Sequence, residues 1–133
     1  MLVLGEGVLE KIIEHCKKVF PLEACGVLSG KETRVEKVFP LTNIEKDAMK
    51  YFADSKEQLR TFKEIENLGM KLLGIYHSHP NGPAYPSDKD IELAFYETSY
   101  LIVSLREFNN PEIKAYKIEK GKVREEELIT EVN

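Results

Sequence analysis

Two histidines and an aspartate in the middle of the chain have the residue types and the spacing of metal ligands. His77 and His79 are separated by one residue at the end of an apolar run that is typical of a strand. Because side chains alternate between the two faces of a strand, both imidazoles point to the same side. Imidazole nitrogens commonly bind zinc, and Asp90, in the first turn of a helix predicted to follow, can supply an oxygen as a third ligand. The pattern therefore predicts a zinc site with three protein ligands.

Such a site has the form that hydrolytic chemistry needs. Three protein ligands leave the fourth corner of a tetrahedral zinc ion to water, which is the arrangement of a catalytic site. Bound zinc lowers the pKa of that water from about 16 to about 7, so hydroxide becomes available at neutral pH. The loop between the ligands contains Pro80, Pro83 and Pro86. Proline fixes φ, so we expect a stiff loop that holds the ligands in place without the help of the metal.

Two further residues could assist this water. Glu23 stands ahead of the apolar run of residues 24–28, where a carboxylate with a raised pKa could act as the general base. Ser87 lies three residues before Asp90 and could donate a hydrogen bond to the oxyanion of a tetrahedral intermediate.

Each feature also has an ordinary explanation. A His-x-His pair can be incidental, and Glu23 can be a surface carboxylate. Ser87 and Asp90 can form a helix N-cap with an acidic residue at the third helical position. The ordinary explanations must all hold independently, whereas one catalytic site accounts for every feature at once.

Taken together, these residues resemble the JAMM (MPN+) metalloprotease motif, which the chain matches at every position that the motif specifies. The matching positions are His77, His79, Pro80, Pro86, Ser87 and Asp90, with a glutamate upstream. The segment Pro21-x-Glu23-x-x-Gly26 is similar to the glutamate segment of the family. The likeness in element order and size covers nearly the whole chain, as in a minimal prokaryotic, archaeal member.

The resemblance implies both a site and a substrate class. His77, His79 and Asp90 would bind one catalytic Zn²⁺ per chain, Glu23 would be the general base and later the proton donor, and Ser87 would stabilise the oxyanion. The family hydrolyses isopeptide or peptide bonds that follow the C-terminus of ubiquitin-like proteins, which in prokaryotes include small archaeal modifiers and sulfur-carrier proteins. The implied fold is a curved mixed sheet flanked by helices, layered as in cytidine deaminases.

The elements that would position these residues alternate along the chain. Helices are predicted for residues 8–20, 56–67 and 88–96, and strands for residues 24–28, 34–41, 71–77, 100–105 and 113–118. The tail after a turn at residues 120–122 is expected to be a final edge strand or a short helix. The spacing predicts that the second helix starts with a capping box of Ser55 and Gln58. It also predicts a buried stripe of Leu59, Phe62 and Ile65. Helices interleaved with a mixed sheet predict an α/β domain.

Length and composition fit one domain that spans residues 1–133. The chain is 42% hydrophobic and 32% charged, as is ordinary for a globular protein. Its uncharged apolar runs are too short to span a bilayer, and residues 1–7 lack the basic start of a signal peptide. We therefore expect a cytoplasmic protein without membrane contact, and leave the oligomeric state, a homodimer included, open.

The charged and sulfur-containing residues exclude other classes. The net charge is −4, with 19 basic and 23 acidic residues and no basic stripe, which argues against a nucleic-acid partner. Cys16 and Cys25 form no Cys-x-x-Cys pair, so neither a structural zinc module nor a redox motif is indicated, and both are expected in the core. His15, on the polar side of the first helix, is expected to be solvated.

Three functions stay in competition. The first is a zinc-dependent isopeptidase acting on ubiquitin-like conjugates. The second is a hydrolase that trims an amino acid, such as cysteine, from a sulfur-carrier protein, and the bond chemistry is the same in both. The third is a noncatalytic scaffold for a ubiquitin-like partner, which the intact Glu23 and Ser87 disfavour. A cytidine deaminase would need His-x-Glu and Pro-Cys-x-x-Cys, and neither is present.

Residues 42–52 have no clear period and are predicted to form a loop that contains Met49, Tyr51 and Phe52. We hypothesise that this loop borders a groove for the tail of the modifier, where an extended tail could add as a strand. Packing of the same residues on the core is the alternative. Family members that process ubiquitin chains grip them with two insertions, and the chain has little room for a second, so selectivity for one linkage is not expected.

Overall fold

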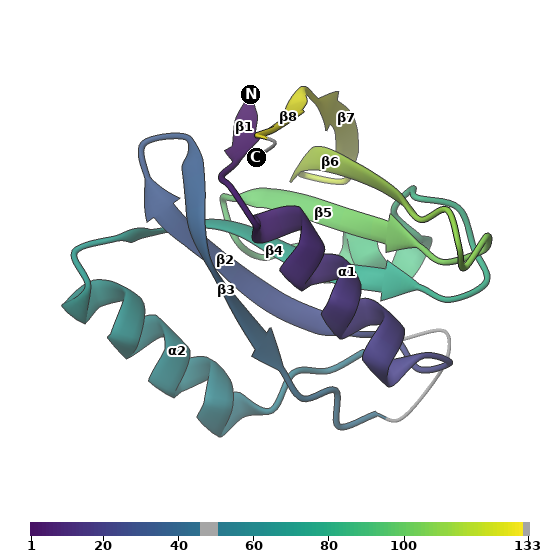
Figure 1. The fold of residues 1–133 in the computed structure, drawn as a ribbon, viewed down its shortest axis with the longest axis horizontal. Coiled ribbons are helices and arrows are strands. Elements are labelled where there is room, and N and C mark those ends of the chain that lie inside the picture. The colour runs from purple at the N-terminus through teal and green to yellow at the C-terminus, as the bar shows by residue number, and fades with distance from the viewer. Residues whose placement is uncertain (46–50, 132–133) are drawn as a thin grey trace.

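The computed structural model describes residues 1–45 and 51–131, which form one mixed sheet of eight strands with three helices (Figure 1). The strand order is β7-β6-β5-β4-β2-β3-β1-β8. The strands are β1 (Leu2–Leu4), β2 (Cys25–Lys31), β3 (Arg34–Leu41), β4 (Lys71–His79), β5 (Ser99–Ser104), β6 (Glu112–Glu119), β7 (Lys122–Glu126) and β8 (Leu128–Thr130). The helices are α1 (Val8–Val19), α2 (Ser55–Asn67) and α3 (Asp88–Glu92).

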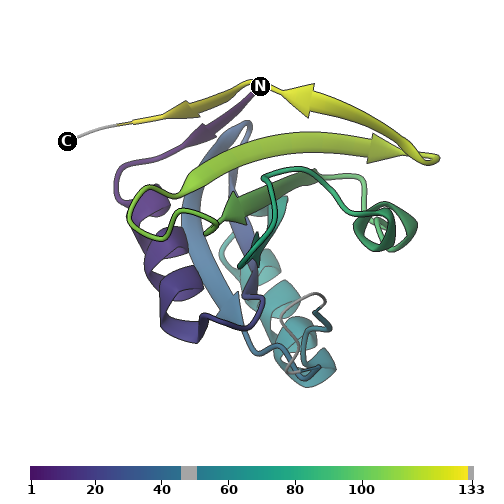
Figure 2. The same cartoon turned by 90° about the vertical axis from the view of Figure 1, so that its right-hand side faces the viewer.

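The sheet curls until the two ends of its strand order approach each other. β7 and β8 stand at opposite ends of the order, yet only Glu127 separates them along the chain. β8 pairs in parallel with β1, and the Leu2 N–H donates to the Glu127 carbonyl at 2.9 Å. Figure 2 shows the chain passing over the top of the molecule from β7 to β8. The prediction of a curved mixed sheet flanked by helices is confirmed, and the tail forms strands.

The two long helices pack on opposite faces of the central strands. Ile12 and Cys16 of α1 join a core cluster with Leu28, whereas Ile65 of α2 joins a second cluster with Val27. Neighbouring residues of β2 thus face different helices, as the period of two requires. Both cysteines are buried, as expected, and burial raises the pKa of each thiol to about 12. None of the helices in the described ranges is long and apolar enough to cross a bilayer.

The start of α2 differs from the prediction. Asp54, not Ser55, is the N-cap residue, and its carboxylate accepts the N–H groups of Lys56 and Glu57. An aspartate side chain at this position satisfies two amides that have no partner inside the helix. The helix therefore starts at Ser55, and the predicted capping box is wrong.

The buried face of α2 is also shifted from the predicted one. Leu59 is 57% exposed, and Thr61 and Ile65 are the buried residues of the helix. Phe62 packs at the edge of the second core cluster. The prediction for Leu59 is therefore wrong, because the helix presents the adjacent stripe to the sheet.

The helix after the proline loop ends earlier than the sequence pattern indicates. The pattern predicts a helix over residues 88–96, but α3 stops at Glu92. The N–H and the carbonyl of Tyr96 both bond the Tyr100 hydroxyl, at 2.9 and 3.2 Å. A side chain of β5 therefore accepts the Tyr96 N–H, which a helix extending to residue 96 would have used. β4, in contrast, continues to His79, so both candidate histidine ligands lie within the strand.

The prediction that His15 is solvated is wrong, because its side chain is half-buried. Its Nδ1 lies 2.7 Å from the hydroxyl of Tyr76, a fully buried residue of β4, and the two rings meet edge to face. Burial, followed by the nearby charge of Lys18, lowers the pKa of His15. Next to the Tyr76 ring stands Gly26, its partner across β2 and β4.

The Gly26→Ala variant is expected to lose about 1–3 kcal/mol in the free energy of unfolding, the usual cost of overpacking a core. A Cβ atom at position 26 would lie 2.2 Å from the Tyr76 ring, which cannot shift without disturbing its contact with His15. Urea denaturation measures the change. Gly82→Ala is the control, because there the nearest atom would be 3.7 Å away. An unchanged midpoint for Gly26→Ala would contradict this account.

Candidate metal centre

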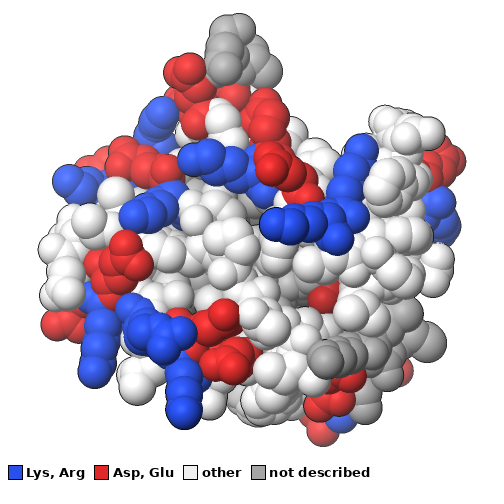
Figure 3. Space-filling view, turned by 60° about the horizontal axis from the view of Figure 1, so that its bottom comes forward, with Lys and Arg blue, Asp and Glu red and all other residues white. Residues whose placement is uncertain are grey.

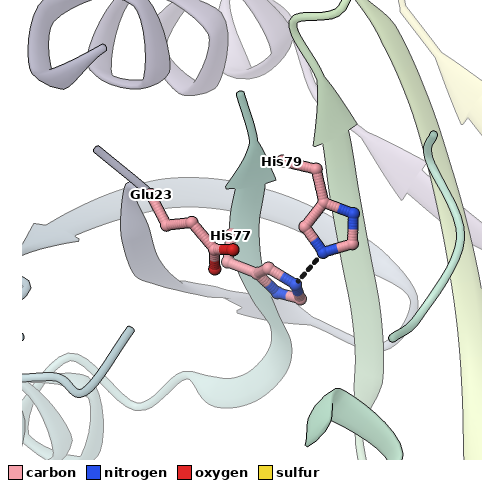
Figure 4. A group of neighbouring side chains, drawn as sticks. All are labelled: Glu23, His77 and His79. Carbon is pink, nitrogen blue, oxygen red and sulfur yellow. Dashed lines mark hydrogen bonds between the residues drawn. The ribbon is translucent and has the colours of Figure 1, made fainter. Parts of the chain in front are cut away.

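Three potential ligand atoms converge at the end of β4. The Nε2 atoms of His77 and His79 lie 3.0 Å apart, and each lies 3.0 Å from Oδ2 of Asp90. The alternation of side chains in β4 places both imidazoles on one side, as the sequence predicts, and Figure 4 shows their Nε2 atoms facing each other. Asp90 arrives from the first turn of α3.

This donor set fits a zinc ion. Zinc takes imidazole nitrogens and carboxylate oxygens at about 2.0–2.2 Å, so two ligands of one tetrahedral ion lie about 3.4 Å apart. The observed triangle has to open by only a few tenths of an ångström to reach that spacing. Nδ1 of His79 donates to the Pro83 carbonyl at 2.8 Å, which leaves the lone pair of its Nε2 for a metal.

The surroundings favour the metal-binding protonation state of His77 and of Asp90, but not that of His79. Burial lowers the pKa of His77. Burial also acts to lower the pKa of His79, but its hydrogen bonds to Asp90 and Pro83 outweigh this and raise it. Burial opposes ionisation of Asp90 as well, yet the two imidazoles hold its pKa well below the usual range. The aspartate is therefore ionised at neutral pH, and His77 is neutral.

Ser87 and Asp90 form a helix cap and lie at the site at the same time. The Asp90 N–H donates to Oγ of Ser87 at 3.1 Å, and the Ser87 N–H donates to Oδ2 of Asp90 at 2.9 Å. The capping box anticipated as the ordinary explanation is thus present. It holds the carboxylate oxygen that faces the imidazoles, so capping and metal binding are compatible.

Glu23 is a buried carboxylate beside this triangle. It is 3% exposed, and one of its oxygens and ring nitrogens of His77 and His79 all lie within 4.8 Å of one another. Figure 4 shows the carboxylate directed toward His77. A buried carboxylate this close to the two imidazoles suits a residue that acts on a water molecule beside the ion.

Ser78, between the two histidines, holds the main chain next to Glu23. It points to the α1 side of β4, where its Oγ accepts the Ala24 N–H at 2.8 Å. Its own N–H donates to the Ala24 carbonyl at 3.0 Å. Sequence reasoning missed this role, although the position of Ser78 between two inward-facing histidines implies that it faces the first helix.

The proline loop is held by the sheet as well as by its prolines. Three consecutive carbonyls of the loop accept hydrogen bonds from buried side chains. The pairs are Gly82 with Ser104, Pro83 with His79, and Ala84 with Tyr116. Ser104 and Tyr116 lie in β5 and β6, far from the motif in sequence, and no local pattern identified them.

Tyr116→Phe is expected to lower the free energy of unfolding by about 1–3 kcal/mol, because the buried Ala84 carbonyl loses its donor. Zinc occupancy at limiting metal concentration is expected to fall with it, since the loop that carries Ser87 toward Asp90 loosens. Thermal denaturation and metal analysis measure both effects. Tyr85→Phe, at an exposed ring that packs against Tyr116, is the control. Equal stability and equal zinc occupancy in the two variants would show that the Tyr116 hydrogen bond does not hold the loop.

Two hollows flank the ligand triangle. The first, about 450 Å³, is lined by Tyr51, Phe52, Phe95 and Tyr96 and reaches Asp90. The second, about 370 Å³, is lined by the proline loop together with Glu23, His79 and Ser87.

The hypothesis that residues 42–52 border a groove can be compared with the structure at two of the three residues it names. Tyr51 and Phe52 line the first hollow, and Met49 lies outside the described residues. The Tyr51 ring also stacks on His77, with centroids 4.7 Å apart and planes 27° from parallel. On the face drawn in Figure 3, basic and acidic side chains are interspersed around an uncharged middle.

Comparison with known proteins gives a consistent family assignment. A family model described as prokaryotic homologs of the JAB domain matches residues 5–119. The CysO-cysteine peptidase of Mycobacterium tuberculosis is 37% identical over 129 residues, which cover 95% of this chain and 88% of that protein. The probable TtuB-protein conjugate cleaving protease of Thermus thermophilus is 35% identical over 91% of this chain and 78% of its own length. The desampylase of Pyrococcus furiosus is 35% identical over 83% and 77%.

Solved structures agree. The solution structure of protein DSY2949 from Desulfitobacterium hafniense has a TM-score of 0.91 and 38% identity, and the match covers 100% of this chain and 94% of that one. A structure described as a metalloprotease-like zinc site of the JAMM type in the proteasome and signalosome has a TM-score of 0.63 and 25% identity, with 98% and 97% covered. The resemblance to the JAMM (MPN+) family is thereby confirmed, and the chain belongs to the JAB (JAMM/MPN) family as a JAMM-type hydrolase.

Proposed function

We propose that the protein is a zinc-dependent protease that hydrolyses the amide bond after the C-terminus of a ubiquitin-like or sulfur-carrier protein. The observation that carries the proposal is the 3.0 Å triangle of His77, His79 and Asp90 with the buried Glu23 beside it. The names of the relatives, which refer to a CysO-cysteine bond, TtuB conjugates and desampylation, support the substrate class.

The proposed mechanism gives each residue one task. When bound, zinc would supply Lewis acidity, which makes hydroxide available at neutral pH. Glu23 accepts the proton that the attacking water loses as the C–O bond forms, and it returns that proton to the leaving amine as the C–N bond breaks. The Ser87 Oγ already accepts the Asp90 N–H, so its own O–H is free to point at the oxyanion. His77, His79 and Asp90 hold the ion.

We assign the tail of the modifier to the first hollow and the leaving amine to the second. Several aromatic rings line the first hollow, which leads to Asp90 and suits an extended tail. The second holds Glu23 and Ser87, the groups that act on the carbonyl and the leaving amine. The lack of nucleic-acid binding and the cytoplasmic location stay predictions.

Phe52→Asp is expected to raise KM for a modifier conjugate by about tenfold, because a charge in the wall of the first hollow would have to lose water when the tail binds. The test is made on KM, which reports binding of the tail in the hollow. Steady-state kinetics on the conjugate measure the effect. Phe108→Asp, at an exposed ring in the β5–β6 connection, is the matched control. A KM equal to that of wild type would show that the tail does not bind in this hollow.

The function is tested with two substrates side by side. One is a ubiquitin-like protein joined to a lysine side chain by an isopeptide bond, and the other is a sulfur-carrier protein with an added C-terminal cysteine. Each is incubated with the zinc-loaded protein, with a chelator, and with zinc restored. We expect cleavage that disappears with the chelator and returns with zinc. Binding of both substrates without cleavage under any condition would favour the noncatalytic scaffold.

A further inference from the structure

One amide side chain stands where the wall of the first hollow meets the main chain of Glu23. Asn43 follows β3, and its main chain forms an isolated bridge with Ala53. Its Oδ1 accepts the N–H groups of Glu45 and Phe52, at 3.0 and 2.9 Å. The side chain therefore joins the chain that follows β3 to the chain that precedes α2.

The other end of the same amide reaches the candidate base. Nδ2 of Asn43 donates to the main-chain carbonyl of Glu23 at 2.9 Å, in a partly buried position. The orientation of the amide follows from its neighbours, since its oxygen faces two N–H groups and its nitrogen faces a carbonyl. Asn43 thus connects Phe52, in the hollow, directly to residue 23.

Glu23 depends on such contacts because no regular element holds it. Residues 23 and 24 lie between α1 and β2. On one side the Ser78 hydroxyl and N–H hold Ala24, and on the other Asn43 holds the Glu23 carbonyl. A misplacement of a catalytic group by about 1 Å can cost about 10²-fold in rate. The position of the carboxylate is therefore sensitive to a shift of Asn43.

The hollow can transmit such a shift. Phe52 lines the hollow and donates its N–H to Asn43, and the preceding residue, Tyr51, stacks on His77. A chain lying in the hollow would press on both side chains. We propose that Asn43 is a positioning residue that couples occupation of the first hollow by the substrate tail to the placement of the Glu23 carboxylate. This inference rests on the proposed function and deepens it.

Two substitutions distinguish the roles of Oδ1 and Nδ2 of Asn43. Asn43→Asp keeps an oxygen for the N–H groups of Glu45 and Phe52 but sets a second oxygen against the Glu23 carbonyl. It should therefore lower kcat by about 10–10², with KM, zinc content and the Kd for the free modifier near wild-type values. Asn43→Ala loses both ends, so KM and Kd should rise as well. Asn109→Asp, the same change at an exposed turn, is the matched control.

The coupling itself is tested with a shortened substrate. Wild type should turn over a conjugate with the complete tail faster, in kcat, than a peptide that carries only the last two tail residues, because contacts remote from the bond are used to place the reacting groups. In Asn43→Asp the two kcat values should become nearly equal. An unchanged ratio, or a wild-type ratio of one, would overturn the coupling. Wild type that cleaves neither substrate would instead overturn the proposed function.

Discussion

Replacing Glu23 by glutamine is expected to lower kcat by about 10²–10⁴, the range that a positioned acid–base group contributes, without loss of zinc. Glutamine has the shape of the glutamate side chain but cannot take up the proton of the attacking water. The substitution leaves the 3.0 Å triangle of His77, His79 and Asp90 unchanged, so these metal ligands should keep their places. Steady-state kinetics and metal analysis of the same sample measure both quantities.

The control for this substitution is Glu119→Gln, an equal loss of charge at the exposed end of β6. Full activity in Glu23→Gln would show that another group accepts the proton. Loss of zinc together with activity would show that Glu23 is itself a ligand, since its carboxylate and the two imidazoles also lie close enough together to hold an ion.

Asp90→Ala is expected to abolish zinc binding at micromolar concentrations and to reduce activity by more than about 10²-fold, because two imidazoles alone form an incomplete site. The same change removes the acceptor for the Ser87 N–H. Loss of a cap typically costs about 0.5–2 kcal/mol, so the apo variant should also unfold at a lower denaturant concentration.

Asp88→Ala is the matched control for this variant, since Asp88 stands in the same first turn of α3 and is exposed. Zinc content is followed by titration with a chromophoric chelator, and stability by urea denaturation. A zinc-loaded and active Asp90→Ala protein would remove the aspartate from the ligand set.

The sequence predicts the parts of the site that are local. His77 and His79 share a face because a strand alternates, and the capping box turns the Asp90 oxygen toward them, so both positions follow from spacing within one segment. The contacts that hold this segment come from elsewhere. Ser104 and Tyr116 bond loop carbonyls across 22 and 32 residues of sequence, and a pairing of that length depends on strand order, which no periodicity encodes.

The wrong predictions have the same origin. Asp54 and Ser55 are both good N-cap residues, and the structure uses the first of them. His15 looks polar on its own helix, but its contact is with Tyr76, 61 residues away. In each case the deciding partner, or the deciding choice between neighbours, is set by tertiary packing.

One oxygen atom of Asp90 serves both the start of a helix and the imidazole pair. Oδ2 accepts the Ser87 N–H and lies 3.0 Å from both rings, and α3 has only five residues. Any ion held there also tightens the first turn of α3, so metal affinity and local opening of that turn are thermodynamically linked. Protection of the Asp90 amide against deuterium exchange should therefore increase with free zinc, and would report on metal occupancy without any substrate.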